Sequence, residues 1–291
     1  MTENAFVAHR SLLFTVAYEM LGSAADAEDV VQESWLRWAD VDQAQVRDPR
    51  SYLVRIVTRQ ALNRLRTLSR RREEYVGEWL PEPLLTSPDV AEDVELAESV
   101  SIAMLTVLET LGPVERAVFV LREVFDLPYG EIAEAVGKSA AAVRQIARRS
   151  REHVASRRPR VPVSRSEQQA VVERFLAALH TGRLQDLIEV MSPDVILTAD
   201  GGGLAPAARE PVHGAALVAR ILARTHHHPQ PPPLRVTPVH LNASPAARIE
   251  IPGETPSAMT LSVANGQITH IYLIRNPQKL THLTHPSPLT R

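Results

Sequence analysis

The stretch "LREVFDLPYGEIAEAVGKSAAAVRQIARRSREHVASRR", residues 121–158, decides the fold of the first half of the chain. Apolar residues recur at helical spacing on both sides of Gly137, and a glycine suits the tight turn between two helices. The pattern predicts a helix-turn-helix in which Ile132 lies in the buried face of the first helix and Val143 in that of the second.

The second helix of this motif has the composition of a DNA-reading face. Small residues at its start allow close approach to base edges, and arginines farther along can reach phosphates. The alternative is a solvated charged helix, but the motif spacing and the unbalanced positive charge together favour DNA binding. The candidate residues are Ser139, Ala142, Arg144, Gln145, Arg148 and Arg149.

Charge is segregated along the chain although the net charge is only −2. Eight arginines and no acid lie between Arg50 and Arg72, whereas the stretch from Glu78 to Glu109 contains acids and no lysine or arginine. The basic stretches suit polyanions, and the acidic stretch cannot itself face nucleic acid.

The composition of the 291 residues, 44% of them hydrophobic, suits two or three globular domains. No run approaches the roughly 18 apolar residues of a membrane helix, and the first ten residues lack the pattern of a signal peptide. The absence of cysteine excludes disulfides and thiol nucleophiles and is compatible with a reducing compartment. We expect a cytoplasmic protein without a membrane partner.

Two more helices are predicted ahead of the motif. Ser23 and Asp26 have capping-box spacing, and the apolar residues up to Trp38 recur every three or four positions beneath an acidic outer face. The Asp48-Pro49 step breaks the chain, and residues 50–72 restart a helix with an arginine stripe outside.

The last third of the chain has a different pattern. Helices are expected over 166–182, with a serine start, and over 184–194, followed by strands over 195–199, 234–241, 247–251 and 259–274. Asn265-Gly266 between alternating apolar runs predicts a hairpin. We expect an α+β unit with a curved antiparallel sheet. The histidines in "THHHPQPPP", residues 225–233, lack other spaced ligands, so no metal is expected.

Three segments taken together resemble regions 2 and 4 of an extracytoplasmic-function sigma factor. They are "SAADAEDVVQESWLRW" (23–38), "DPRSYLVRIVTRQALNRLR" (48–66) and the helix-turn-helix, in that order. The resemblance covers about residues 5–158. It implies core RNA polymerase, through its β′ clamp helices and β flap, and promoter DNA as partners.

The resemblance also assigns roles to residues. The acidic helix would dock on the clamp helices through Asp26, Asp29, Gln32 and Glu33, for which the alternative is an exposed charged face. The promoter minus-ten element would lie near Arg55, Arg59, Asn63 and Arg66, with a flipped base captured by loop 39–48. The face over 139–151 would read the minus-thirty-five element. The alternative of an anionic membrane for the arginine stripe is disfavoured, because the helix lacks a wide apolar face.

Three short strings extend the resemblance to the whole chain. "WLPEP" at 79–83, "DGGG" at 200–203 and "NPQKL" at 276–280 resemble the signatures of the sigma-factor group with a SnoaL-like C-terminal extension, a cone-shaped α+β barrel of the nuclear transport factor 2 superfamily. Gln278 stands where that group usually has Asp. The implied domains are region 2 (1–72), a linker (73–97), region 4 (98–158), a second linker (159–165) and the SnoaL-like domain (166–291).

The glycines after Asp200 admit several interpretations. A phosphate loop is disfavoured because the stretch lacks a Gly-Lys-Ser/Thr ending and a following helix. Asp200 with His213 superficially fits acid–base work, but no further groups converge on them, so neither catalysis nor a cofactor is expected. A simple turn stays open. The favoured interpretation is a regulatory contact between domains, formed by Trp79, Leu80, Pro81, Glu82, Pro83, Asp200, Gly201, Gly202, Gly203, Asn276, Pro277, Lys279 and Leu280.

The sequence therefore predicts an alternative sigma factor, not an enzyme, with a fused domain that modulates its activity in cis in place of a separate anti-sigma protein. Whether the fused domain activates or inhibits stays open, as does a small ligand in its barrel. The alternative is a DNA-binding regulator whose barrel is a sensor or an enzyme.

Overall fold

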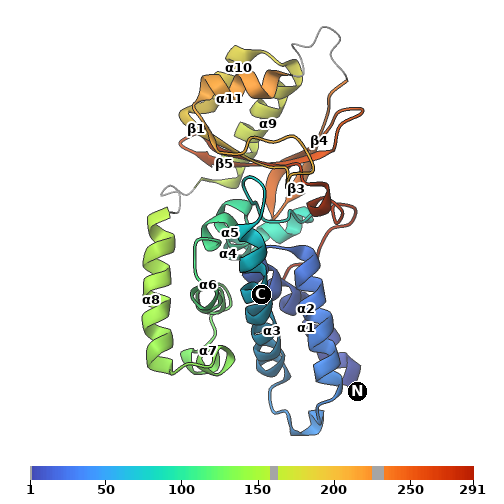
Figure 1. Ribbon diagram of the computed structural model, residues 1–291, viewed down its shortest axis with the longest axis vertical. Coiled ribbons are helices and arrows are strands. Elements are labelled where there is room, and N and C mark those ends of the chain that lie inside the picture. Colours follow the sequence, from blue (N-terminus) through green and yellow to red (C-terminus); the bar gives the residue numbers. More distant parts are fainter. Residues whose placement is uncertain (1, 158–162, 225–232) are drawn as a thin grey trace. The chain divides into compact units, whose positions relative to one another are not determined.

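The computed structural model describes residues 2–157, 163–224 and 233–291 (Figure 1). They form two compact units, which we call unit 1 and unit 2. Unit 1 comprises Met1–Glu74, Ser87–Arg158 and Ser287–Arg291, and unit 2 comprises Tyr75–Thr86 and Pro159–Pro286. Residues 75–86, predicted as linker, are thus part of unit 2, and the last five residues are part of unit 1.

Unit 1 is helical. Its helices are α1 (Thr2–Leu21), α2 (Ala24–Ala39), α3 (Pro49–Glu73), α4 (Val94–Ser99), α5 (Ile102–Leu108), α6 (Pro113–Phe119), α7 (Tyr129–Val136) and α8 (Ala140–Arg157), with short turns η1 (Gln43–Gln45), η2 (Pro88–Glu92) and η3 (Val120–Val124). The first three helices pack on one another around Trp38, which is 1% exposed. Ser23 caps α2 by accepting the Asp26 N–H, as the spacing predicts.

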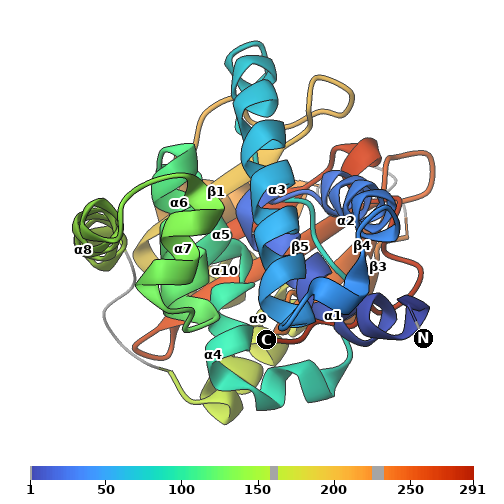
Figure 2. The same ribbon diagram turned by 90° about the horizontal axis from the view of Figure 1, so that it is seen from below.

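The helix-turn-helix is formed by α7, Gly137 and α8. Gly137 has a φ of 68°, a left-handed conformation that suits glycine at the end of a helix. Ile132 and Val143 are fully buried between the helices of this part of unit 1. Helix α7 also packs beside α3 (Figure 2). The structure therefore confirms the motif predicted from residues 121–158.

Unit 2 is an α+β fold. Its elements are α9 (Arg165–Thr181), α10 (Leu184–Val190), β1 (Met191–Asp200), β2 (Val212–His213), α11 (Ala215–Leu222), β3 (Arg235–Leu241), β4 (Ser244–Glu250), β5 (Ser257–Ala264), β6 (Gln267–Ile274) and η5 (Pro277–Lys279). The strands form one sheet in the order β2-β1-β6-β5-β4-β3. The three helices cover one side of it (Figure 1) and enclose a core that includes Phe175, Val195 and Ile271.

The sheet differs in one respect from the prediction of an antiparallel sheet. Strands β5 and β6 form the predicted antiparallel hairpin, with Asn265 and Gly266 at φ 51° and 71° in the turn. Strand β1, however, pairs with β6 in parallel. The prediction of a wholly antiparallel sheet was wrong because alternation along a strand fixes its faces and not the direction of its neighbour.

Two predicted helices of unit 2 also have different bounds in the structure. The expected serine start at Ser166 was wrong, because Ser164 caps α9 instead by accepting the Glu167 N–H. The second helix ends at Val190, and Met191 already begins β1. The histidine-rich stretch 225–233 lies outside the described residues except for Pro233. Its three histidines are therefore not described. Within the described ranges, no helix has the length and apolarity to cross a membrane.

A buried polar cluster joins α1 to α4 and α6 inside unit 1. Ser99 donates to Glu19 Oε1 at 2.8 Å, and Arg116 Nε donates to the Glu19 carbonyl at 2.9 Å. Arg116 also pairs with Glu109. Burial raises the pKa of the Glu19 carboxyl to about 8, against the smaller lowering effects of Ser99 and Arg116. Burial therefore favours the neutral form of the Glu19 carboxyl in the folded protein.

We expect Glu19→Gln to change the pH dependence of stability. A carboxyl whose pKa rises on folding contributes stability that is complete below its ordinary pKa of 4.5 and is lost as the pH rises through about 8. The neutral amide of the variant does not titrate, so its stability does not fall in this way. The difference between the melting temperature of the variant and that of the wild type should therefore increase from a pH of about 5 to about 9. Melting curves over this range test the expectation, and a constant difference would contradict it.

Candidate functional site

The candidate DNA-reading face lies on the exposed side of α8. Ser139 caps the helix by accepting the Ala142 N–H at 3.2 Å. Arg144, Gln145, Arg148 and Arg149 are exposed, and Ala142 is half-buried. Arg148 contacts Glu152 one turn farther along at 2.9 Å, a contact between two well-exposed side chains that costs little to exchange for a phosphate. The helix thus offers a small-residue start followed by cations.

The arginine stripe of α3 has partners on α7. Arg55 Nη1 lies 2.9 Å from Glu134 Oε2, and Arg59 Nη2 donates to the Glu134 carbonyl at 2.8 Å. Farther along, Arg66 donates to Asn63 Oδ1 at 3.2 Å, and both side chains are exposed. Arg55 and Arg59 were both predicted to lie near the promoter minus-ten element. In the structure they are bound by α7, the first helix of the helix-turn-helix.

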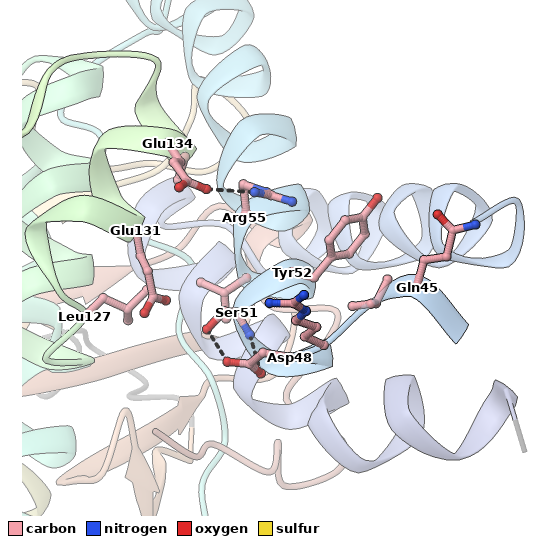
Figure 3. Close-up of a pocket in the computed structure, with 12 residues that line it drawn as sticks. Gln45, Asp48, Ser51, Tyr52, Arg55, Leu127, Glu131 and Glu134 are labelled. Carbon is pink, nitrogen blue, oxygen red and sulfur yellow. Dashed lines mark hydrogen bonds and ion pairs between the residues drawn. The ribbon is translucent and has the colours of Figure 1, made fainter. Parts of the chain in front are cut away.

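A pocket of about 340 Å³ lies beside this contact. It is lined by residues 45–48 of the loop predicted to capture a flipped base, by the first turns of α3 and by α7 (Figure 3). Asp48 accepts the Ser51 N–H and hydroxyl at one edge, and Arg55 stacks on the Tyr52 ring at 5.0 Å. The loop and α7 therefore face each other across one opening.

The acidic face of α2 is turned partly toward α3. Arg64 binds Asp26 and Asp29 at 2.6 Å each, and Gln60 donates to Glu33 at 3.0 Å. Asp29 keeps 57% of its side chain exposed. Gln32 and Glu33 are exposed as well. The four candidate docking residues thus share one accessible face, held in place by α3.

The polar centre of unit 2 is Asp200, whose side chain is fully buried at the end of β1. Its Oδ1 accepts the Tyr75 hydroxyl at 2.6 Å, and its Oδ2 accepts the Leu80 N–H at 2.9 Å. Lys279 Nζ lies 2.7 Å from Oδ2. Burial, and then the hydrogen bond to Asp200, raise the pKa of Tyr75, so its hydroxyl remains a donor.

Lys279 completes this centre. Its Nζ donates to the Leu80 carbonyl at 2.5 Å and lies 4.0 Å from the centre of the Trp79 ring and 5.0 Å from that of Tyr75. An ammonium between a carboxylate, a carbonyl and two ring faces combines an ion pair with cation–π contacts. We call Tyr75, Trp79, Asp200, Asn276 and Lys279, with the Leu80 backbone, the Asp200 cluster.

The glycines allow close approach of Tyr75 and Val76, two residues that the sequence prediction did not include. Gly202 has a φ of 58°, and a Cβ there would lie 2.2 Å from Asn276 Nδ2 and 2.8 Å from the Tyr75 hydroxyl. A Cβ on Gly203 would lie 3.3 Å from Val76. Gly201 is buried, and its Cβ would meet the Ala205 carbonyl oxygen at 2.1 Å. The triple glycine is thus both a turn and a contact surface.

The remaining candidates of this contact are placed as follows. Asn276 donates to the Tyr75 hydroxyl at 2.8 Å and accepts the Gln278 N–H through its Oδ1. Pro277 and Gln278 are exposed. Gln278, which stands where the related sigma-factor group usually has Asp, therefore lies outside the Asp200 cluster. Leu280 is half-buried, and Leu80, Pro81, Glu82 and Pro83 are all buried.

Residues beyond the predicted set hold the rest of segment 75–86 on unit 2. Leu85 bridges to Leu241 at the end of edge strand β3, in antiparallel fashion. Thr86 N–H donates to the His240 carbonyl at 3.0 Å, and Leu84 N–H donates to Asn242 Oδ1 at 2.9 Å. The segment covers part of an edge that would otherwise be unpaired. The "LNASP" turn signal at 241–245 was the one available pointer to Asn242.

The acid–base interpretation gains no support from this geometry. Both Asp200 oxygens have partners within the cluster, whereas the exposed His213 sits opposite Ile196, four positions before Asp200 on β1. In the part of the chain that the structure describes, no three His, Asp or Glu side chains gather as metal ligands would.

Comparisons with known proteins agree with these features. Models of Sigma-70 region 2 and Sigma-70 region 4 match residues 5–71 and 101–154. The chain is 36% identical to the ECF RNA polymerase sigma factor SigJ of Mycobacterium tuberculosis, over 97% of this chain and 94% of the relative. It is 33% identical to a probable ECF sigma factor SigI of the same species, over 96% and 94%. The crystal structure of M. tuberculosis SigJ matches with a TM-score of 0.76 at 34% identity, over 95% of this chain and 97% of that one.

The helix-turn-helix and the helices before it are therefore those of a sigma factor. The chain belongs to the extracytoplasmic-function RNA polymerase sigma factor family. It is an alternative sigma factor that directs transcription, and like SigJ it carries a fused C-terminal α+β domain, which confirms the fold class predicted from the sequence.

We expect Gly202→Ala to loosen segment 75–86 from unit 2. The new Cβ would displace Asn276 and Tyr75 and would strain a left-handed backbone. Gly253→Ala is the matched control, because Gly253 has a φ of 83° and a Cβ added there would meet no atom within 4 Å. Limited proteolysis within 75–86 should accelerate in the first variant only. Equal cleavage in both variants would show that the close approach at Gly202 contributes nothing.

Proposed function

We propose that the chain binds core RNA polymerase through α2, reads promoter DNA through α8 and the arginine stripe of α3, and is regulated in cis by unit 2 without catalysis. The observation that carries the regulatory part is the Asp200 cluster, which holds residues 75–86, the connection between regions 2 and 4, on unit 2.

The DNA-reading part is supported by composition and exposure. Arg144 and Gln145 lie near the start of α8, where a recognition helix contacts base edges, and Arg148 and Arg149 lie one turn farther along, in reach of phosphates. The helix-turn-helix belongs to the segment that matches Sigma-70 region 4. Core polymerase and promoter DNA are therefore the proposed partners.

The regulatory part follows from the position of the captured segment. Twelve residues of free chain could span up to about 40 Å, so regions 2 and 4 could adopt many separations if the segment were released. Holding the segment through Asp200 and Asn242 removes that freedom. The interaction is intramolecular and acts at a high effective concentration, which would take the place of a separate anti-sigma protein.

We expect Arg144→Ala with Arg148→Ala to weaken promoter-specific initiation while core binding survives. Each arginine contact with DNA contributes about 1–3 kcal/mol. Arg183→Ala is the control, because Arg183, the residue before α10 in unit 2, is an exposed arginine with an ion pair of the same type. Run-off transcription beside a core-polymerase pull-down measures both properties. Unchanged initiation would refute the placement of the DNA face.

The variant Asp29→Ala with Glu33→Ala tests the other surface. Its affinity for core polymerase should fall first. Both carboxylates lie on the accessible face of α2, and Asp26 and Arg64 keep their contact in this variant. Retained core affinity would move the docking face elsewhere.

We expect Trp79→Ala and Lys279→Gln to change promoter-specific transcription in the same direction. Both substitutions remove the contact between the Lys279 ammonium and the Trp79 indole ring. The change in transcription in the double variant should therefore be smaller than the sum of the changes in the two single variants. Gln278→Ala, an exposed neighbour on η5, is the control and should leave transcription unchanged. Strictly additive effects would show that Trp79 and Lys279 do not act through one interface.

A further inference from the structure

Residues Ser287–Arg291 belong to unit 1, although the residues that precede them in sequence belong to unit 2. Leu289 is 5% exposed. The Thr290 N–H donates to Thr15 Oγ1 on α1 at 3.1 Å. Arg291 Nε lies 2.7 Å from Asp93 Oδ2, and Arg291 also pairs with Glu95. Thr290 and Arg291 thus make a backbone and an ionic contact with unit 1, next to a leucine that is buried.

The receiving surface is formed by two helices. Thr15 is fully buried, and its hydroxyl also donates to the Ser11 carbonyl at 2.8 Å, which fixes the oxygen that Thr290 reaches. Asp93 caps α4 by accepting the Leu96 N–H at 3.0 Å, so its carboxylate is held as well. We call this surface, formed by Thr15 of α1 with Asp93 and Glu95 at the start of α4, the α1–α4 seam.

The charge of the seam suits its occupant. The stretch from Glu78 to Glu109 contains no lysine or arginine, so the acids at the start of α4 lack a basic neighbour in sequence. Arg291 supplies the positive charge. An exposed ion pair contributes little by itself, so the apolar side chain of Leu289 and the Thr290 N–H provide the anchor and the acids select a basic residue after them.

The two helices of the seam belong to different parts of the sigma half. Helix α1 overlaps the match to region 2, whereas α4 follows segment 75–86 and precedes the match to region 4. The two helices are also linked directly by the buried bond from Ser99 to Glu19. A segment that contacts both helices therefore resists their separation.

We propose that the α1–α4 seam is a docking surface for a short segment with a leucine and a following arginine, and that residues 287–291 occupy it in cis to keep unit 1 closed. In the closed arrangement Arg55 and Arg59 are held by Glu134 of α7. The regulatory consequence rests on the proposed function, because it requires these arginines to serve promoter DNA.

The test compares undocking variants with matched controls in the full chain. Leu289→Asp with Arg291→Glu removes the anchor and reverses the charge, while Leu289→Met with Arg291→Lys keeps both. Thr290→Pro removes the N–H that Thr15 accepts, while Thr290→Ala keeps it. The absence of native cysteine allows dyes to be placed at Thr67→Cys on α3 and Lys138→Cys after α7, both exposed positions.

Energy transfer between the dyes reports the separation of α3 from the helix-turn-helix. We expect both undocking variants to raise the open fraction at least about fivefold and the controls to leave it unchanged. Transcription from core polymerase should rise with the open fraction. An unchanged open fraction in both undocking variants, with amide exchange showing residues 289–291 released, would overturn the proposal. A raised open fraction without a rise in transcription would support the docking surface and instead contradict the role given to Arg55 and Arg59.

Discussion

A single buried carboxylate organises the arrangement from which the regulatory proposal follows. Asp200 is fully buried, and it can remain so only because Tyr75, the Leu80 N–H and Lys279 satisfy it. Removing one partner of such a buried pair costs about 3–5 kcal/mol, because a charge is left without compensation. Two of the three partners come from residues 75–86. The burial of Asp200 in unit 2 and the binding of residues 75–86 are therefore thermodynamically coupled.

The sigma half has its own internal contacts, which connect the same regions by other means. Glu134 holds Arg55 and Arg59, and the Glu19–Arg116 cluster joins α1 to α6. Under the proposed function, these contacts are exchanged for contacts with polymerase and promoter. Exposed pairs such as Arg55 with Glu134 are exchanged at little cost, whereas the buried Glu19 cluster is not. We infer that opening starts at the exposed contacts.

Local chemistry made some elements predictable. Gly137 ends a helix and Asn265-Gly266 makes a hairpin because backbone conformation dictates those residue types. The parallel pairing of β1 with β6 was not predictable, since it depends on how the chain returns to the sheet. The structure brings the WLPEP, DGGG and NPQKL strings together, and their regulatory role stays a prediction. Tyr75 was missed because an isolated tyrosine carries no local signal.

The most direct test of the central claim is amide hydrogen exchange of residues 75–86 in the full chain. The Leu80, Leu84 and Thr86 N–H groups donate to Asp200, Asn242 and His240 in unit 2. They should exchange far more slowly than an unstructured linker, and Asp200→Asn should accelerate the exchange of Leu80 most. Exchange of all three amides at the rate of an unfolded peptide in the wild-type chain would contradict the claim that this segment is a structural part of the C-terminal unit.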